Sequence, residues 1–351
     1  MTSHLAVSID RSSDAPPLST ELIESAAELE ALRPEWEALW AHCPGATPFQ
    51  WPAWLVAWWR HFTPGALFSV AVRRAGRLVA VAPFYIEAGA QGRRILPIGI
   101  SLSDYLDVLI DPACGEPAGC AIVARLVAEA GRWDGWDLED LAPGAAAFGL
   151  PCPGGCTEAA SDSHTAPVLA LPASVDALSE CIPARKLRKL RMARNRAARR
   201  GAVTLVRADE SDMDELLDRL FALHRARWEN RGEPGGVLSD ARVEHFQREV
   251  APDLLAAGML RLYALRIDGH VIGAYYGLAH GARAYAYLGG FDPDYAFESP
   301  GTILIGHAIE EAVREGAREF HFLRGPESYK YEWGAVDRWN RRRAFRWAAR
   351  G

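Results

Sequence analysis

The fold of this chain is decided by residues 282–290, Ala-Arg-Ala-Tyr-Ala-Tyr-Leu-Gly-Gly, and residues 298–302, Glu-Ser-Pro-Gly-Thr. In the first stretch, aromatic side chains alternate with small or polar ones at the period of a β-strand. The strand then meets Gly289 and Gly290, where the missing Cβ allows a ligand to approach the backbone. We therefore predict a strand with an open edge, followed by a turn at residues 292–294 and a helix.

The predicted helix has clear signals at both ends. Ser299 has the side chain of an N-cap, and Pro300 stands at the first helical position, where its missing N–H has no hydrogen bond to lose. Gly316 supplies the stop. One apolar face is formed by Ile305, Ala308, Ile309, Ala312 and Val313. A helix N-terminus beside a glycine-opened strand offers N–H groups and a positive dipole end, which suit a pyrophosphate; a plain cap without a ligand is the alternative.

A second strand follows this helix. Residues 318–323, Arg-Glu-Phe-His-Phe-Leu, alternate again, and residues 324–334 form a polar and aromatic loop at the strand end. The stretch 287–334, with its Ser-Pro-Gly-Thr helix start and its ending Tyr-Lys-Tyr-Glu-Trp-Gly at 329–334, resembles the C-terminal half of GNAT acyltransferases. The branch that it resembles is the double-domain one labelled as CelD-like cellulose-biosynthesis acetyltransferases, which is related to the Fem aminoacyl transferases.

The resemblance continues upstream through His224-x-x-Arg227-Trp228, Arg231-Gly232 and the Asp268-Gly269 turn, so it covers residues 180–347 and, loosely, 30–140. It implies a mixed α/β (α+β) fold of two tandem GNAT-like domains, each a mixed, mostly antiparallel sheet flanked by helices. It also implies an N-acetyltransferase-type enzyme that uses acetyl-CoA or another acyl-CoA as co-substrate, without a metal, and acylates an amine or hydroxyl of a sugar, polysaccharide precursor or small metabolite.

One departure from the GNAT pattern leaves the donor open. The usual phosphate loop, which reads Arg or Gln, two residues, Gly, one residue, and Gly or Ala, does not precede the helix at Ser299. An aminoacyl-tRNA donor, as in the Fem-like branch, is therefore an alternative. A non-catalytic GNAT module that binds a partner in envelope or polysaccharide biosynthesis is another.

An internal repeat indicates two related halves. Residues 71–80 align with residues 264–273 at a constant offset of 193, and each segment reads as a strand, a turn with Gly and a strand. Chance similarity of two hairpins is the alternative, but the order of the following elements is shared as well. We expect a flexible tail at 1–19, an N-terminal half at 20–180 and a C-terminal acyltransferase half at 181–351.

Composition limits the classes of partner. The net charge of −6 over 351 residues gives no case for DNA binding. Six cysteines without a CxxC pair or histidines at metal spacing predict reduced thiols and no metal site. Residues 1–17 carry no targeting pattern, and no run of eighteen apolar residues occurs, so we expect a cytoplasmic protein without a membrane span.

Residues 185–200 are an exception to the acidic composition, because they hold nine basic side chains and no acidic one. Leu187, Leu190, Ala193 and Ala197 form an apolar stripe at helical spacing. We expect a basic helix that faces the cleft between the halves and binds phosphates of the donor or acceptor. A solvated helix face, an RNA surface and a membrane surface are the alternatives.

Acyl transfer needs donors for the carbonyl, an acid for the leaving group and a base for the nucleophile. The resemblance implies that the acid is Tyr329 rather than Tyr331, and packing of these rings in a hydrophobic lid is the alternative. Glu298, near the predicted strand ends, is the expected base, and support of the helix N-terminus is the alternative role of its carboxylate. Further candidates for the base are His224, His321 and Glu327. The residues expected to bind the cofactor are Gly289, Gly290, Phe291, Ser299, Gly301 and Thr302. Those expected to bind a small-molecule or glycan acceptor, or the anionic part of a substrate such as tRNA, are Arg227, Trp228, Arg231, Lys330, Arg188 and Arg191.

Overall fold

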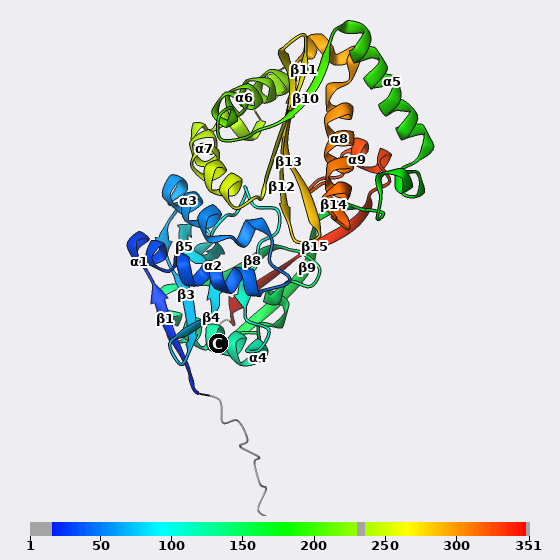
Figure 1. Ribbon diagram of the computed structural model, residues 1–351. Helices are drawn as coiled ribbons and strands as arrows, with labels where there is room; N and C mark the ends of the chain where they lie inside the picture. The colour runs from blue at the N-terminus through cyan, green and yellow to red at the C-terminus, as the bar shows by residue number, and fades with distance from the viewer. Residues whose placement is uncertain (1–15, 230–235, 349–351) are drawn as a thin grey trace, which may run out of the picture.

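Two α/β halves meet along a shared sheet in the computed structural model, which describes residues 16–229 and 236–348 (Figure 1). The expected tail at 1–19 lies mostly outside the described residues, and β1 begins at Leu18. The first half contains β1 (Leu18–Ile23), α1 (Ala26–Ala31), α2 (Arg33–His42), η1 (Pro48–Gln50), α3 (Pro52–Phe62), β2 (Ala66–Leu67), β3 (Ser69–Arg74), β4 (Arg77–Ala82), β5 (Phe84–Gly89), β6 (Gly92–Pro97), β7 (Leu109–Ile110), α4 (Gly115–Ala128), η2 (Ala130–Arg132), β8 (Gly135–Leu141) and η3 (Ala146–Gly149).

The first half ends with the long strand β9 (Cys156–Ala170). The elements of the second half are η4 (Val175–Glu180), α5 (Ala184–Arg200), β10 (Val203–Arg207), α6 (Met213–Glu229), η5 (Gly236–Ser239), α7 (Ala241–Ala256), β11 (Leu260–Ile267), β12 (His270–His280), β13 (Arg283–Phe291), η6 (Pro293–Glu298), α8 (Pro300–Arg314), β14 (Glu319–His321), α9 (Ser328–Glu332) and β15 (Val336–Trp347). The predicted mixed fold, with sheets flanked by helices, is confirmed.

The repeat predicted from the sequence appears as two equivalent hairpins, β3–β4 and β11–β12. Their turns have nearly identical backbones, with φ of 49° and 81° at Ala75 and Gly76 and 49° and 82° at Asp268 and Gly269. Two consecutive positive φ values define a type I′ turn, whose twist suits a tight hairpin. Each hairpin also has a β-bulge on its second strand, and the extra residues, Val79 of β4 and Ile272 of β12, lie 193 residues apart. The similarity of the two hairpins is therefore confirmed.

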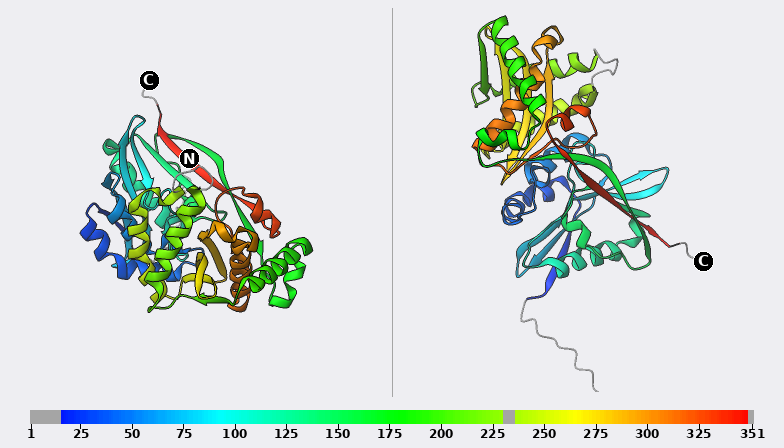
Figure 2. Two further views of the ribbon diagram at one scale, coloured as in Figure 1. Left: turned by 90° about the horizontal axis from the view of Figure 1, so that it is seen from above. Right: turned by 90° about the vertical axis from the view of Figure 1, so that its right-hand side faces the viewer.

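The last strand of each half pairs with the other half. β9 pairs with β14 of the second half, with Leu169 opposite Phe320, whereas β15 pairs with β8 of the first half, with Phe345 opposite Trp136. β9 and β15 also pair with each other along most of their length and cross between the halves (Figure 2). This exchange gives one eleven-stranded sheet in the order β10-β11-β12-β13-β14-β9-β15-β8-β6-β5-β2 among the described residues.

The helices of the second half cover both faces of β11, β12 and β13 (Figure 1). α6 and α7 lie on one face, and α8 with the basic helix α5 lies on the other. α8 starts at Pro300 as predicted, and Gly316 follows its end with a φ of 86°. α5 packs on α8 through Leu190, Ala193 and Ala197, which are buried. The prediction that α5 faces the cleft between the halves is wrong, because its apolar stripe binds it to the outer side of α8.

The face with α6 and α7 also packs against the first half. The Trp54 ring of α3 lies 4.8 Å from Phe246 of α7 and 5.4 Å from Tyr287 of β13. Tyr287 also donates a hydrogen bond of 2.9 Å to the Leu102 carbonyl. The first half therefore forms one wall beside β13. Within the described ranges, no helix combines the length and apolar character needed to cross a bilayer.

Candidate active site

The parallel strands β13 and β14 separate in the middle of the second half. They pair only from Arg283 to Tyr285, opposite Glu319 to His321, whereas β13 stays paired with β12 as far as Phe291. Tyr287 is the extra residue of a β-bulge on β13, which bends the strand at the point where the two diverge. Among the described residues, one edge of β13 thus has no strand partner beyond Tyr285.

Strand geometry decides which amides face this open edge. The Asp292 N–H donates to the Ile272 carbonyl at 2.9 Å, so alternation directs the Gly290 amide toward β12 and the Gly289 and Phe291 amides toward the open edge. Gly289 and Phe291 therefore stay candidates for polarising a carbonyl, but Gly290 does not. A Cβ at Gly290 would lie 2.4 Å from the backbone nitrogen of His224, so this glycine permits the approach of α6 rather than of a ligand.

Two side chains of α6 reach the Gly289 carbonyl. His224 Nδ1 lies 3.2 Å from this oxygen, and Arg227 NH1 lies 3.4 Å from it. The guanidinium of Arg227 also lies over the Phe291 ring, 5.2 Å from its centroid. His224 is 5% exposed, and burial lowers its pKa to about 4. Among the described residues, its Nε2 has no hydrogen-bond partner.

The rest of the predicted acceptor cluster lies beside His224. The Trp228 ring is 5.9 Å from the His224 ring, and a Cβ at Gly236 would lie 3.0 Å from the indole, so η5 covers Trp228 closely. Arg231 lies outside the described residues. The helix α6 thus brings His224, Arg227 and Trp228 together at the open edge of β13.

A pocket of about 530 Å³ lies at the N-terminus of α8. Its lining combines arginines of α5 with an aromatic ring of η6: Met192, Asn195, Arg196, Arg199, Arg200, Phe297 and Glu298. Arg196 stacks over Phe297 at 4.8 Å, and Arg200 stacks over Tyr295 at 5.3 Å. The start of α8 therefore has cationic groups beside it, as a phosphate site requires, although these come from the end of α5 and not from Arg188 and Arg191.

Ser299 begins α8 differently from the sequence prediction. Its φ is 57°, and its side chain makes no capping hydrogen bond; instead Ser299 Oγ accepts one from Arg196 at 3.3 Å. The Thr302 amide is already bonded to the Ser299 carbonyl at 3.0 Å. A Cβ at Gly301 would lie 3.6 Å from the Phe291 ring, so the start of α8 adjoins the end of β13.

The position of Glu298 argues against its predicted role as a base. Its carboxylate lines the pocket beside Arg196, Arg199 and Arg200 and is 6% exposed. The other acidic candidate, Glu327, pairs with the Lys330 ammonium at 2.9 Å. The side chains with hydrogen bonds to the Gly289 carbonyl are those of His224 and Arg227, not these carboxylates.

Lys330 is a correction to the predicted substrate-binding set. Its Nζ is buried and donates to the carbonyls of Leu323, Arg324 and Gly325 at 2.9, 2.6 and 3.1 Å. Three carbonyls and one carboxylate occupy the donors of this ammonium, which stabilises the loop after β14. Arg188 and Arg191 are exposed on α5 and lie outside the lining of the pocket.

Tyr329 and Tyr331 both belong to α9. The Tyr329 ring lies 6.2 Å from Phe322, against the cluster on the α8 side of the sheet. Tyr331 donates to the Asp337 carboxylate at 2.7 Å on the surface. His321 contacts Tyr105 at 2.9 Å and Glu319 at 3.0 Å through its two ring nitrogens, so neither nitrogen is available as a base.

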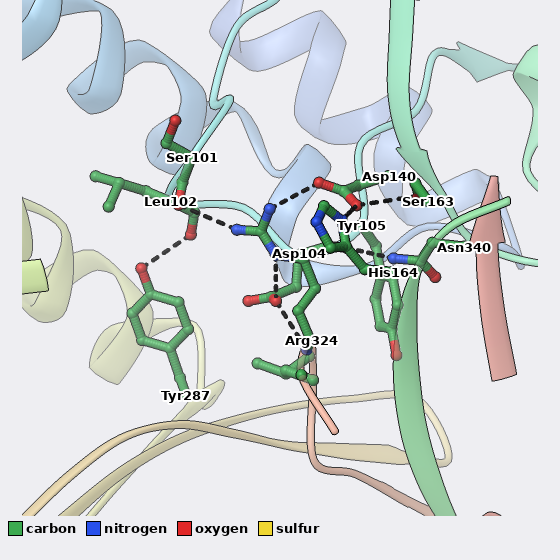
Figure 3. A network of polar contacts seen from close by, with 12 residues as sticks. Ser101, Leu102, Asp104, Tyr105, Asp140, Ser163, His164, Tyr287, Arg324 and Asn340 are labelled. Carbon is green, nitrogen blue, oxygen red and sulfur yellow. Dashed lines mark hydrogen bonds and ion pairs between the residues drawn. The ribbon is translucent and has the colours of Figure 1, made fainter. Parts of the chain in front are cut away.

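A buried polar network at the junction of the halves was not predicted (Figure 3). Arg324 follows β14 and donates to Asp104 and Asp140 of the first half at 2.9 and 2.7 Å, and to the Ser101 carbonyl at 3.1 Å. His164 contacts the other oxygen of Asp140 at 2.8 Å. No sequence signal points to this network, because Arg324 lies 220 residues from Asp104.

Comparisons with known proteins identify similar sequences for the second half and similar folds for both halves. Residues 184–331 match the sequence model of the family described as acetyltransferase (GNAT) domain. Among solved structures, FemX is similar over 93% of this chain and 96% of its own, at 13% identity and a TM-score of 0.64. The C-terminal domain of a putative lysylphosphatidylglycerol synthetase from Agrobacterium fabrum is similar at 14% identity and a TM-score of 0.55, over 91% of this chain and 92% of its own.

L-PGS from Bacillus licheniformis is also similar, at 12% identity and a TM-score of 0.57, over 89% of this chain and 91% of its own. At these identities the likeness shows a shared fold across both halves. A comparison with curated protein sequences finds no match. Residues 184–331, which carry the open edge of β13 and the pocket beside α8, are therefore the part of the chain that is similar in sequence to acetyltransferase (GNAT) domains.

Proposed function

We propose that the protein transfers an acyl group from acetyl-CoA or another acyl-CoA to an amine or hydroxyl of a sugar, polysaccharide precursor or small metabolite, as in the CelD-like branch. The observation that carries this proposal is the separation of β13 from β14, with the Gly289 and Phe291 amides facing the opening. An extended acyl-pantetheine arm could pair with such an edge as an added strand, and its carbonyl would then meet backbone N–H donors.

The phosphate end of the same donor would bind in the pocket at the N-terminus of α8. Arg196, Arg199 and Arg200 line the pocket, and Arg196 contacts Ser299 at the start of α8, where the helix dipole is positive. Phe297 is 70% exposed there, which leaves an aromatic face for a nucleobase. Because Gly301 at the start of α8 adjoins Phe291 of β13, a single donor could extend from the pocket to the open edge.

The chemistry then depends on a few groups of this chain. The Gly289 N–H would stabilise negative charge on the acyl carbonyl oxygen as the nucleophile attacks. Tyr329, in the first turn after the loop that follows β14, would donate its phenolic proton to the leaving sulfur or oxygen. The first half would shape the acceptor side, since Trp54 and Leu102 contact Tyr287 next to the opening.

An aminoacyl-tRNA donor is the second candidate. The missing GNAT phosphate loop favours it, and so does the likeness to FemX over nearly the whole chain. The basic face of α5 would then contact the RNA backbone. A non-catalytic module is a third reading, which the absent phosphate loop also favours.

Thermal unfolding with added ligands separates these functions. We expect acetyl-CoA, longer acyl-CoAs and free CoA to raise Tm, because a ligand that binds only the folded state stabilises it by about 2.7 kcal/mol at a hundredfold excess over Kd. Stabilisation by an aminoacyl-tRNA minihelix alone would favour the second candidate. Lack of response to every CoA derivative and to the minihelix would contradict acyl transfer by this chain.

A further inference from the structure

We propose that His224 is the general base of the reaction and that Gly289 both orients this base and binds the acyl oxygen. The inference rests on the acyl transfer proposed above. In this role His224 takes the place of Glu298. His224 contacts Gly289 at the open edge of β13, whereas Glu298 lines the pocket at the N-terminus of α8.

The hydrogen bond to Gly289 sets the tautomer of His224. A carbonyl oxygen can only accept, so His224 Nδ1 carries the proton that it donates across 3.2 Å. The Nε2 of the neutral ring then holds a lone pair. This nitrogen is buried and has no hydrogen-bond partner among the described residues, which is unfavourable for a polar atom. The N–H or O–H of a bound acceptor would supply the missing donor.

Gly290 fixes this base relative to β13. Its missing Cβ lets the backbone of α6 approach so closely that a Cβ there would lie 2.4 Å from the His224 nitrogen. The next residue along the strand, Gly289, turns both its C=O and its N–H to the open edge. One peptide segment thus holds the imidazole through the carbonyl and presents the amide to the acyl oxygen, as a base and an oxyanion donor must be arranged.

The proton balance of the step is complete. His224 Nε2 accepts the proton of the acceptor while the nucleophilic nitrogen or oxygen forms its bond to the acyl carbon. The bond from that carbon to the donor sulfur breaks, and the sulfur takes up a proton from Tyr329. The imidazolium loses its proton and Tyr329 regains one, directly or through water, so both groups are restored and the products are the acylated acceptor and a free thiol.

The electrostatic surroundings keep the ring neutral. Burial first, and then Arg227 and Arg225, lower the pKa of His224. Both arginines belong to α6, and Arg225 is paired with Glu244 of α7. On the β13 side, the ring contacts the Gly289 carbonyl, and Gly290 lies against the His224 backbone; neither residue titrates. The base is therefore ready in its deprotonated form at neutral pH.

The test compares H224Q and H224N with H245Q, a control on the exposed histidine of α7. We expect the His224 variants to lose about 10²–10⁴-fold in kcat, the range typical of a general base, while Kd for the acyl-CoA changes less than about threefold. H245Q should retain the wild-type values. The acid limb of the wild-type kcat/KM profile should lie below pH 5 and should be absent from the residual activity of H224Q.

Nitrogen NMR of the histidines gives a readout that does not need turnover. A neutral Nδ1–H tautomer of His224 between pH 6 and 8 is expected. An Nε2–H tautomer, a protonated ring at pH 7, or near wild-type kcat in both His224 variants would contradict the role of His224. These results would not contradict acyl transfer by the protein. A wild-type protein that binds no donor and transfers no acyl group would overturn the proposed function itself.

Discussion

Arg324 Nε lies 2.9 Å from Asp104 Oδ1, so the loop after β14 is tied to the first half beside the candidate site. The same guanidinium holds Asp140 of β8, and the Arg324 amide donates to Asp104 at 3.0 Å. Three non-glycine residues around this guanidinium have positive φ: Ser101 at 74°, Asp140 at 50° and Leu323 at 61°. Such backbone costs of order 1–3 kcal/mol at each residue, and the hydrogen bonds of Arg324 offset this cost.

Removing Asp104 should therefore destabilise the whole protein. We expect D104A to lose about 3 kcal/mol of unfolding free energy, because it leaves a largely buried guanidinium without one of its carboxylates. Urea denaturation checks this value. The matched control is D134A, which removes the partner of Arg93 in an ion pair on the surface and should have little effect. Equal losses in the two variants would contradict the structural role of Arg324.

The exchange of β9 and β15 predicts that a C-terminal substitution damages the first half. Phe345 of β15 is fully buried and stacks on Trp136 of β8 at 4.7 Å. F345A should cost about 3–5 kcal/mol, the usual loss for a large aromatic in a core. Hydrogen exchange should accelerate in β8 and α4, although they lie some 200 residues away in the sequence. Faster exchange confined to residues after 184 would contradict the observed pairing.

The sequence allowed the local elements of the second half to be predicted, because their signals are local. The Pro300 start, the Gly316 stop and the type I′ turn at residues 268–269 each depend on a residue's own backbone preference. The strand exchange could not be predicted, since a strand pattern shows which face is buried and not which strand lies beside it.

The candidate site was predicted only in part for the same reason. Gly289 and Gly290 were recognised as a special pair, but only tertiary packing shows that Gly290 accommodates α6 while Gly289 faces the opening. Lys330 stands among the residues expected to bind substrate, but the structure buries its ammonium. Its three carbonyl partners become visible only when the loop is folded around it.

Substitution of Gly289 and Gly290 tests whether only Gly290 is needed for the packing of α6. G290A places a Cβ against the α6 backbone, and such overpacking typically costs about 1–3 kcal/mol. G289A meets no atom closer than 3.6 Å, so its stability should stay close to that of the wild type. Thermal unfolding of both variants measures the contrast. Similar Tm values would mean that α6 does not depend on the glycine at residue 290.

Acid stability should depend on Glu319. Hydrogen bonds from His321 and then Arg338 lower the pKa of this carboxyl from 4.5 to about 2. The ionised form therefore stabilises the fold above about pH 5, and this contribution is lost as the pH falls toward 2. Between pH 6 and 3 the wild type should lose about 2 kcal/mol more than E319Q in urea titrations. E210Q, on an exposed residue, should follow the wild-type profile. Identical profiles for E319Q and the wild type would contradict the assignment.

The last prediction separates the two ends of the basic helix α5. R199E/R200E reverses charges in the lining of the pocket at α8, whereas R188E/R191E reverses two exposed charges outside it. If donor phosphates bind at this pocket, the first variant should weaken acyl-CoA binding by at least tenfold. Raising the salt concentration should reduce the difference in affinity between this variant and the wild type, because exposed charges are screened over about 8 Å at physiological ionic strength. The second variant has the same change in net charge, so it serves as a control for the long-range attraction between the protein and the anionic CoA. Calorimetric titration of CoA against both variants measures the difference. Equal weakening by the two would indicate a diffuse basic surface, as an RNA backbone requires, and would contradict a phosphate site at the start of α8.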